Sequence, residues 1–165
     1  MPIRQLPPSV TIKIAAGEVV ERPASVMKEL VENALDAGAT EVTVALAGGG
    51  TELIRVQDNG CGITAPEVPI AFQRYATSKL AELDDFDRLD TLGFRGEALP
   101  TIAAVADVTL VTRPAEDNAG YAFRGRAGVV AEQGPRAAAP GTVITVRDLF
   151  RELPARRKFL RSENT

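Results

Sequence analysis

The sequence contains no histidine and only one cysteine, and both scarcities exclude whole classes of chemistry. Without histidine, these 165 residues can form no Ser-His-Asp triad, no histidine zinc site and no phosphohistidine. A lone cysteine, Cys61, cannot form a disulfide within the chain, which is compatible with a reducing compartment. No apolar run approaches the ~20 residues that a membrane-spanning helix needs, and the first residues do not resemble a signal peptide. We therefore expect a cytoplasmic protein without a membrane partner.

The bulk composition is that of an ordinary soluble domain. The chain is 45% hydrophobic and 25% charged, and its 165 residues suffice for one domain with a real core. The net charge is -3 and the sequence pI is about 5.1. The chain as a whole therefore has no drive toward nucleic acid or anionic membranes, and any such contact requires a local patch.

The N-terminal part of the chain reads as helical. Three early prolines indicate an extended arm, and helical spacing follows over 11–20. A second helix begins near Pro23 to Ser25, where Ser25 can cap, and it ends at Gly38.

The remaining segments read mostly as strands. Residues 41–57 predict a hairpin that turns at Gly48-Gly49-Gly50. The other expected elements are a short helix over 66–75, a polar stretch over 76–96, a helix over 97–105, and β segments over 107–113, 120–132 and 142–148. This order favours an α+β, two-layer sandwich, with helices on one face of a mixed, mostly antiparallel sheet.

The second helix carries an octet of mixed polarity, Glu29-Leu30-Val31-Glu32-Asn33-Ala34-Leu35-Asp36. Helical periodicity places Glu29, Glu32, Asn33 and Asp36 on one face. A carboxylate one turn from a carboxamide offers a base and a neutral oxygen ligand to the same volume, which suits water activation beside a magnesium ion. Taken alone, such a face is more often solvated surface.

A glycine-rich segment, Asp58-Asn59-Gly60-Cys61-Gly62, follows the hairpin's second strand. An acid at a strand end beside two glycines suits the amino group of an adenine, although the same letters also form a common turn. The spacing Gly60-x-Gly62-x-x-Ala65 matches the loose dinucleotide fingerprint. We reject that reading because Pro66 delays the helix that the fingerprint requires at its glycines. No P-loop pattern is present.

Three later segments suit phosphates or a base. Thr77, Ser78 and Lys79 offer two hydroxyls and an ammonium, or form an ordinary polar loop. The segment Gly93-Phe94-Arg95-Gly96-Glu97-Ala98-Leu99 precedes a helix, whose free N–H groups could hold an anion and whose glycines permit hinge motion; a simple helix-initiating turn is equally compatible. Thr142, after Gly141, could present a hydroxyl to the same pocket or merely begin a strand.

These motifs, in this order, resemble those of the GHKL ATPases, the superfamily of gyrase, Hsp-type chaperones and histidine kinases. Within it, the chain resembles the MutL family of DNA mismatch repair proteins over essentially its whole length. The stretches that carry this resemblance are Ile14-Ala15-Ala16-Gly17-Glu18-Val19-Val20-Glu21-Arg22-Pro23, Leu35-Asp36-Ala37-Gly38-Ala39-Thr40, Gly93-Phe94-Arg95-Gly96-Glu97-Ala98-Leu99 and Pro154-Ala155-Arg156-Arg157-Lys158-Phe159-Leu160.

The resemblance implies a Bergerat fold that binds ATP and magnesium. Glu29 would be the general base, Asn33 would hold the magnesium, and Asp58 would accept a hydrogen bond from the adenine amino group. The implied nucleotide-binding residues are Asn33, Asp58, Gly60, Gly62, Thr77, Ser78, Lys79, Gly93, Phe94, Arg95, Gly96, Glu97, Ala98, Leu99 and Thr142.

The resemblance also implies a biological role and a domain plan. ATP would switch the N-terminal regions into a homodimeric clamp, which couples a MutS-type mismatch sensor to a downstream helicase or nuclease. We expect an N-terminal arm over 1–20, the ATP-binding domain over 21–150 with a mobile lid at about 76–99, and a basic tail over 151–165. A second subdomain would supply a lysine, so turnover in this chain should be weak or absent.

The sequence departs from the family pattern at several places, and two other readings stay open. Tyr75 stands where histidine is frequent, Pro100 where a small helix former is usual, and 151–153 replaces an aromatic-Asn-Thr run. One alternative is a binding module, an ATP-gated switch in which hydrolysis matters little. The other is sequence-nonspecific DNA binding by the basic tail, which could instead be a solvated or interdomain helix. The tail's candidate DNA-binding residues are Arg156, Arg157, Lys158 and Arg161.

Overall fold

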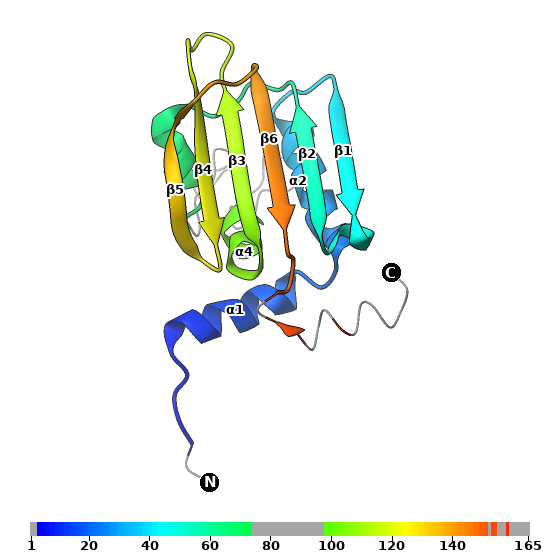
Figure 1. The fold of residues 1–165 in the computed structure, drawn as a ribbon, viewed down its shortest axis with the longest axis vertical. Helices are drawn as coiled ribbons and strands as arrows, with labels where there is room; N and C mark the ends of the chain where they lie inside the picture. The colour runs from blue at the N-terminus through cyan, green and yellow to red at the C-terminus, as the bar shows by residue number, and fades with distance from the viewer. Residues whose placement is uncertain (1–2, 74–97, 152, 155–157, 159–165) are drawn as a thin grey trace, which may run out of the picture.

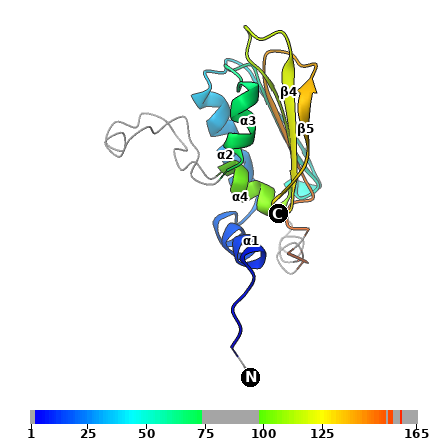
Figure 2. The same cartoon turned by 90° about the vertical axis from the view of Figure 1, so that its left-hand side faces the viewer.

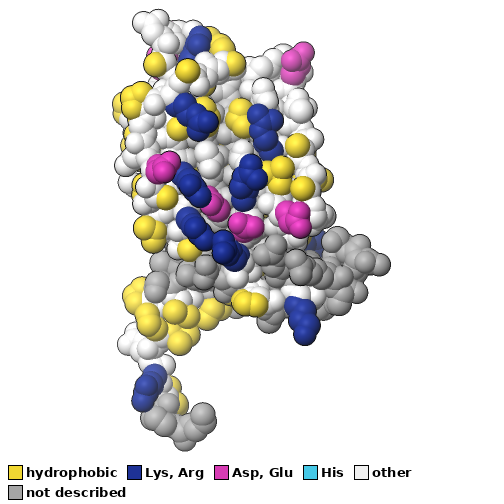
Figure 3. Space-filling model, viewed as in Figure 1, with side chains coloured by type: hydrophobic (Ala, Val, Ile, Leu, Met, Phe, Trp, Pro, Cys, Tyr) yellow, Lys and Arg dark blue, Asp and Glu magenta, His cyan; other side chains and the backbone are white. Residues whose placement is uncertain are grey.

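The protein is a two-layer α/β sandwich in a computed structural model that describes residues 3–73, 98–151, 153, 154 and 158. A six-stranded sheet forms one layer, and α2, α3 and α4 cover one of its faces (Figures 1 and 2). The other face of the sheet is open to solvent (Figure 3). The predicted sandwich is confirmed, and every pair of neighbouring strands in this sheet is antiparallel, whereas the sequence suggested some parallel pairing.

The helices follow the sequence pattern with small differences. They are α1 (Pro8–Val19), α2 (Pro23–Asp36), α3 (Val68–Ala71), which follows the 3-10 turn η2 (Ala65–Glu67), and α4 (Ala98–Val105). The prediction that Ser25 caps α2 is wrong, because the N-cap is Arg22 and no side chain caps the helix. Pro23 fills the first helical position, where its missing N–H costs nothing. Gly38, with φ of 75°, follows the end of α2 as expected.

The strands are β1 (Val42–Ala47), β2 (Leu53–Asp58), β3 (Asp107–Arg113), β4 (Gly120–Arg126), β5 (Val129–Arg136) and β6 (Gly141–Arg147), with the 3-10 turn η1 (Gly48–Gly50) between β1 and β2. Their order across the sheet is β1-β2-β6-β3-β4-β5. The last strand in the chain therefore lies between the second and third, with β2 on one side and β3 on the other. This placement brings the end of β2, the start of β6 and the end of β3 together at one end of the sheet, although the three are distant in sequence.

Two boundary predictions are wrong. The segment expected as one strand over 120–132 is two strands, β4 and β5, joined by a tight turn at Ala127 and Gly128. Both turn residues have positive φ, 50° and 81°, which matches the twist of a two-residue hairpin. The helix expected over 66–75 ends at Ala71 in the described structure.

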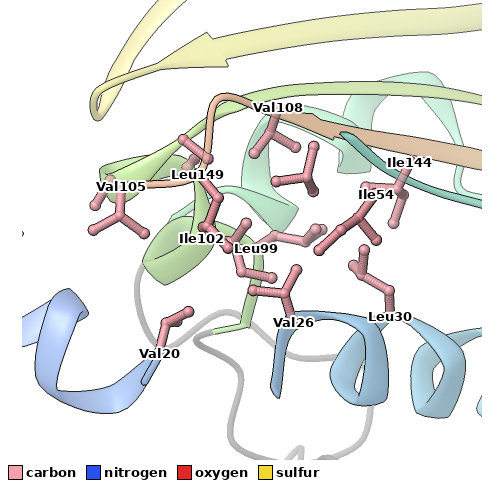
Figure 4. Packing of buried hydrophobic residues seen from close by; sticks show 14 of the residues in the cluster. Val20, Val26, Leu30, Ile54, Leu99, Ile102, Val105, Val108, Ile144 and Leu149 are labelled. Atoms are coloured by element: carbon pink, nitrogen blue, oxygen red, sulfur yellow. The ribbon is translucent and has the colours of Figure 1, made fainter. Parts of the chain in front are cut away.

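The core lies between the sheet and the helices, and it fixes which face of α2 is turned inward. Val26 and Leu30 of α2, one turn apart, meet Ile54 of the sheet and Ile102 of α4 (Figure 4). Each of these side chains is at most 1% exposed. Burying one of them stabilises the fold by about 1.5–3 kcal/mol. Rotation of α2 about its axis would expose this pair, so the orientation of the whole helix is set by packing.

None of the described helices is long and apolar enough to cross a membrane.

Candidate functional site

The polar face of α2 lies beside its buried stripe. Glu29 and Asn33 each precede a buried residue, Leu30 and Ala34, and both are partly buried themselves. One residue rotates the side chain by about 100° around the axis, so both polar groups flank the core contact. Glu32, in contrast, forms an ion pair with the exposed Lys28, at 3.8 Å between Oε1 and Nζ. Glu32 therefore has an ion-pair partner on its own helix, and we assign it no part in the chemistry expected of Glu29 and Asn33.

Asp58 ends β2 with a half-buried carboxylate. Its Oδ1 accepts a hydrogen bond from the backbone N–H of Gly60 at 2.8 Å. Burial raises the pKa of Asp58 above its ordinary value of 3.8, and backbone hydrogen bonds from Gly60 and Thr142 oppose that rise. Because burial is the larger effect, a further hydrogen-bond donor from a ligand would stabilise the ionised carboxylate. That is the property required of a group that accepts from a purine amino group.

The loop after Asp58 is held to its neighbours by several hydrogen bonds. Asn59 Oδ1 accepts from the N–H groups of Thr40 and Glu41, at 2.8 and 2.9 Å. Asn59 Nδ2 donates to Thr40 Oγ1 at 2.8 Å. The N–H of Cys61 donates to the carbonyl of Ala37, just beyond α2, at 2.9 Å. The glycine-rich segment is therefore organised before any ligand arrives, which lowers the entropic cost of binding.

Two glycines allow this loop and the neighbouring strand to approach closely. Gly62 has φ of 73°, and a Cβ there would lie 2.7 Å from backbone atoms of Arg113 and Pro114. Gly141 has φ of 115°, and a Cβ there would overlap the carbonyl oxygen of Asp58. Any other residue would be strained in backbone conformation and blocked in space at both positions.

A buried hydroxyl pair lies next to Asp58 on the same face of the sheet. Asp58 is opposite Thr142 in the β2–β6 register, and Thr142 is opposite Thr112 in the β3–β6 register. The Oγ1 atoms of the two threonines are 2.8 Å apart. Sequence reasoning identified Thr142 but missed Thr112, because Thr112 reads only as one more residue of an alternating strand. Asn59 was likewise interpreted as a turn residue, and its hydrogen bonds to Thr40 and Glu41 were missed.

The remaining predicted nucleotide-binding residues have different outcomes. Ala98 and Leu99 begin α4, and the Leu99 side chain is buried in the core, so only its backbone could meet a phosphate. Those that lie outside the described residues are Thr77, Ser78, Lys79, Gly93, Phe94, Arg95, Gly96 and Glu97, and with them most of the lid expected at about 76–99. Of the candidate DNA-binding residues of the tail, Lys158 is exposed, while Arg156, Arg157 and Arg161 are also outside the described part.

The candidate adenine acceptor, the candidate magnesium ligand and the candidate base follow one another along α2. Gly60 is packed against Ala37, where a Cβ on the glycine would lie 2.7 Å from that of the alanine. Asn33 and Glu29 precede Ala37 by one and two turns, which is about 6 and 12 Å along a helix axis. The acceptor at Asp58, the carboxamide and the carboxylate thus follow one another along the helix-covered side of the sheet. An extended ligand with a base at one end and phosphates at the other fits this order.

The donor set suits magnesium better than a fully protein-bound metal. Within the described residues, no group of three or more His, Cys, Asp or Glu side chains could hold a metal ion. Magnesium is typically held by one or two protein oxygens together with water and the phosphates of a substrate. The carboxamide oxygen of Asn33 is such a ligand, so the chemistry of the site fits a nucleotide-borne magnesium.

Known proteins resemble this chain in sequence and in fold. Residues 18–99 match the family described as histidine kinase-, DNA gyrase B- and HSP90-like ATPase. The chain is 58% identical, over all 165 residues, to a DNA mismatch repair protein MutL of Xylella fastidiosa, of which it spans 27% of the length.

Solved structures agree with the sequence comparison. One is the N-terminal domain of a DNA repair protein, with a TM-score of 0.76 and 27% identity over 92% of this chain and 43% of that one. Another is the MutL ATPase domain of Aquifex aeolicus complexed with ADP, with a TM-score of 0.64 and 36% identity over 86% of this chain and 48% of that one. On this sequence identity and shared fold, the chain belongs to the MutL family, with the fold of its GHKL-type ATPase domain.

Proposed function

We propose that this chain binds ATP together with magnesium and carries the machinery for its hydrolysis. The observation that supports this most is the Asp58–Thr142 pair, which is held beside a pre-organised loop on the side of the sheet that α2 covers. Two hydrogen-bond acceptors at the partly buried, paired ends of β2 and β6 suit the amino group of a purine. On α2, Asn33 and then Glu29 lie progressively farther from the base site. This order places a magnesium ligand and a general base toward the phosphates of a bound nucleotide.

Each of these side chains has a distinct role in the proposed reaction. Asp58 accepts a hydrogen bond from the adenine amino group and so orients the base. Asn33 would hold, through its neutral carboxamide oxygen, the magnesium that accompanies the phosphates, and the bound ion would supply charge neutralisation there. Glu29 accepts a proton from the water that attacks the γ-phosphorus, while the bond to the β,γ-bridging oxygen breaks and ADP leaves. Residues 77–79 and 93–99 remain predicted phosphate contacts.

Calorimetric titration with a non-hydrolysable ATP analogue, with and without magnesium, tests the proposal. We expect saturable binding that strengthens when magnesium is present. Asp58→Asn should abolish it, because the carboxamide can present its N–H to the adenine amino group and loses the charge that attracts that donor. Asp148→Asn makes the same charge change just after β6, at the far end of that strand from Thr142, and should leave binding intact. Equal binding by the Asp58 variant and the wild type would contradict the assignment of the base site.

The role of the complete protein is part of the same proposal, because the chain spans about a quarter of its relative's length. We propose that nucleotide binding drives N-terminal dimerisation and couples a MutS-type mismatch sensor to a downstream helicase or nuclease in the cytoplasm. The domain plan stays a prediction: an arm over 1–20, an ATP-binding domain over 21–150, and a tail over 151–165 that leads to a second subdomain. Turnover by this chain alone should be weak or absent.

DNA contact is a second candidate function, and the solvent-facing side of the sheet supports it. Residues opposite each other in an antiparallel pair point to the same face, so the register assigns this face unambiguously. By the register, six arginines belong to this face: Arg55, Arg113, Arg124, Arg126, Arg136 and Arg147. Figure 3 shows basic side chains gathered across the sheet. The strands place only Asp107 and Glu132 among them as acids.

The net charge of this face is positive, although the chain as a whole is acidic. Arg124 holds Asp107 through two hydrogen bonds, Nε to Oδ1 at 3.1 Å and Nη2 to Oδ2 at 2.7 Å. The pKa of Asp107 lies below its ordinary value because of this bond and the charges of Arg126 and Arg147. A hollow of about 540 Å³ opens between these groups and β5. Such a face suits the phosphates of a duplex, and phosphate contacts carry no sequence information.

Binding to a duplex of arbitrary sequence, followed by fluorescence anisotropy at several salt concentrations, tests this function. The double variant Arg126→Glu/Arg147→Glu should weaken binding and flatten the slope of log affinity against log salt. Arg22→Glu/Lys28→Glu makes the same charge change on the helical side and should retain the slope. If only the control reduces binding, the helical side is the contact. If removal of residues 151–165 alone abolishes binding, the basic tail is the contact instead.

A further inference from the structure

Thr112 is a buried polar side chain near the end of β3, and its hydroxyl makes three contacts. It is 1% exposed. Its Oγ1 accepts a hydrogen bond from the N–H of Ile63 at 2.9 Å. The same atom lies 3.2 Å from the carbonyl oxygen of Gly141 and 2.8 Å from Thr142 Oγ1. One hydroxyl therefore links the glycine-rich loop, the start of β6 and the threonine beside Asp58.

The proton of Thr112 can satisfy these contacts in one way only. A hydroxyl has one proton to donate and two lone pairs that accept. The carbonyl of Gly141 can only accept, so the single proton of Thr112 must point to it for that contact to be a hydrogen bond. Ile63 and Thr142 then donate to the two lone pairs of Thr112. In this arrangement the proton of Thr142 is committed to Thr112, and Thr142 presents only oxygen lone pairs to a ligand.

We propose that Thr112 is a positioning residue that fixes Thr142 as a hydrogen-bond acceptor, and so makes the base site select a 6-aminopurine over a 6-oxopurine. This inference rests on the nucleotide binding proposed above. Thr112 does not touch the nucleotide. It acts by orienting the hydroxyl of its neighbour and by holding the loop at Ile63.

The selectivity follows from the number of acceptors that face the base. An ionised Asp58 carboxylate accepts only, and the committed Thr142 accepts as well. The 6-amino group of adenine has two N–H donors, whereas the 6-oxo group of hypoxanthine or guanine is an acceptor. A 6-oxopurine would thus place an oxygen against Thr142 without a proton between them. A site with fixed polar groups rejects an analogue of the wrong hydrogen-bonding type much more strongly than a site with free rotors does.

Removing the Thr112 hydroxyl should reduce this preference in a specific manner. In Thr112→Val, which is nearly isosteric, Thr142 regains a free proton that can turn toward a 6-oxo group. The N1–H of hypoxanthine can then donate to Asp58 while its oxygen accepts from Thr142. We expect ADP affinity to fall about tenfold, the size of one lost hydrogen-bond arrangement, while IDP affinity does not fall. Loosening of the loop would weaken both nucleotides equally and cannot produce this split.

The experiment is calorimetric titration of the whole chain with ADP and with IDP, which lacks the 2-amino group of GDP. Thr112→Ser keeps the hydroxyl and should keep the wild-type ratio of affinities. Thr109→Val makes the same substitution on the opposite face of β3 and should keep it as well. Circular dichroism confirms that each variant is folded. Thr142→Val, which removes the acceptor itself, should also lose discrimination. Thr112→Ala, which also removes the Thr112 hydroxyl, serves if Thr112→Val does not fold.

Three results would overturn the inference, and they are distinguishable from failure of the proposed function. An unchanged ADP-to-IDP ratio in Thr112→Val, with wild-type ADP binding intact, refutes the role of Thr112 alone. A Thr112→Ser variant that behaves like Thr112→Val shows that packing, and not the hydroxyl, is responsible. A wild-type chain that binds neither nucleotide refutes the proposed function, and the role of Thr112 with it.

Discussion

Asp58, at the end of β2, lies directly opposite Thr142, near the start of β6, although about half of the chain separates them in sequence. The approach of the two strands depends on Gly141, which leaves room for the Asp58 backbone. The contact sets the carboxylate in a partly buried position, and that burial raises its pKa. Substitutions and changes of pH at this strand pair, and at the helix beside it, should therefore have specific and measurable effects.

The protonation of Asp58 should make both stability and nucleotide affinity depend on pH, in opposite directions. The pKa of this carboxyl is raised in the folded chain, so the folded state binds the proton more tightly than the unfolded state does. Its contribution to the stability of the ligand-free protein is therefore present at low pH and is lost as pH rises from about 3.8 through the folded-state pKa. Urea unfolding across this window should show the loss, and Asp58→Asn should remove that part of the pH dependence.

Nucleotide affinity should increase over the same window, because the ionised carboxylate is the stronger acceptor for an amino group. Titrations of an ATP analogue at several pH values measure this. The midpoint should lie above 3.8 in the wild type. An affinity that stays constant across the window, in a chain that remains folded, would show that Asp58 does not meet the base.

Glu29→Gln should separate binding from hydrolysis. The amide has the shape of the carboxylate but cannot accept the proton of the attacking water, so turnover should fall by roughly 10²–10⁴-fold. Affinity for the analogue with magnesium should change little. Steady-state phosphate release and calorimetry give the two quantities.

Glu32→Gln is the matched control, because Glu32 lies about one turn from Glu29 on the same helix but pairs with Lys28. It should retain turnover. If the wild-type chain releases no phosphate at all, the binding-module reading describes this chain, and hydrolysis must be measured in the full-length protein.

Gly141→Ala should be more disruptive than other glycine substitutions at positive φ. A Cβ there overlaps the backbone of Asp58, so β2 and β6 must separate at the base site. Gly128→Ala is the control, because Gly128 also has positive φ, 81°, but a Cβ there would meet no atom within 4 Å. The control should cost about 1–2 kcal/mol from backbone strain alone, and Gly141→Ala should cost more and abolish nucleotide binding. Equal losses in denaturant unfolding would refute the steric argument.

Asn59→Ala should loosen the connection between the glycine-rich loop and the start of β1. It removes the acceptor shared by the N–H groups of Thr40 and Glu41 and the bond to the Thr40 hydroxyl. These bonds are near the surface, so the expected loss is about 1–2 kcal/mol. Asn59→Asp keeps the acceptor and loses only the donated bond, so it should be less destabilising. Hydrogen exchange at Thr40 and Glu41 should accelerate in the alanine variant and not in the aspartate variant.

The helices and hairpins with strong local signals could be predicted from the sequence. Pro23 and Gly38 delimit α2 because the first position tolerates proline and the position after the helix favours glycine. Gly48-Gly49-Gly50 marks the turn between β1 and β2 for a similar reason. The division of 120–132 was missed because Ala127, a residue without turn preference, takes a positive φ beside Gly128.

By itself, then, the sequence determined the local elements and the spacing of Glu29, Asn33 and Asp58, because backbone preferences and helical periodicity act between near neighbours. Only the tertiary structure decided which groups meet. The insertion of β6 between β2 and β3 brings Thr142 between Asp58 and Thr112, and no local pattern encodes a contact across such distances in sequence. Burial of Val26 and Leu30 decides which face of α2 remains polar, because the core holds the helix in one orientation.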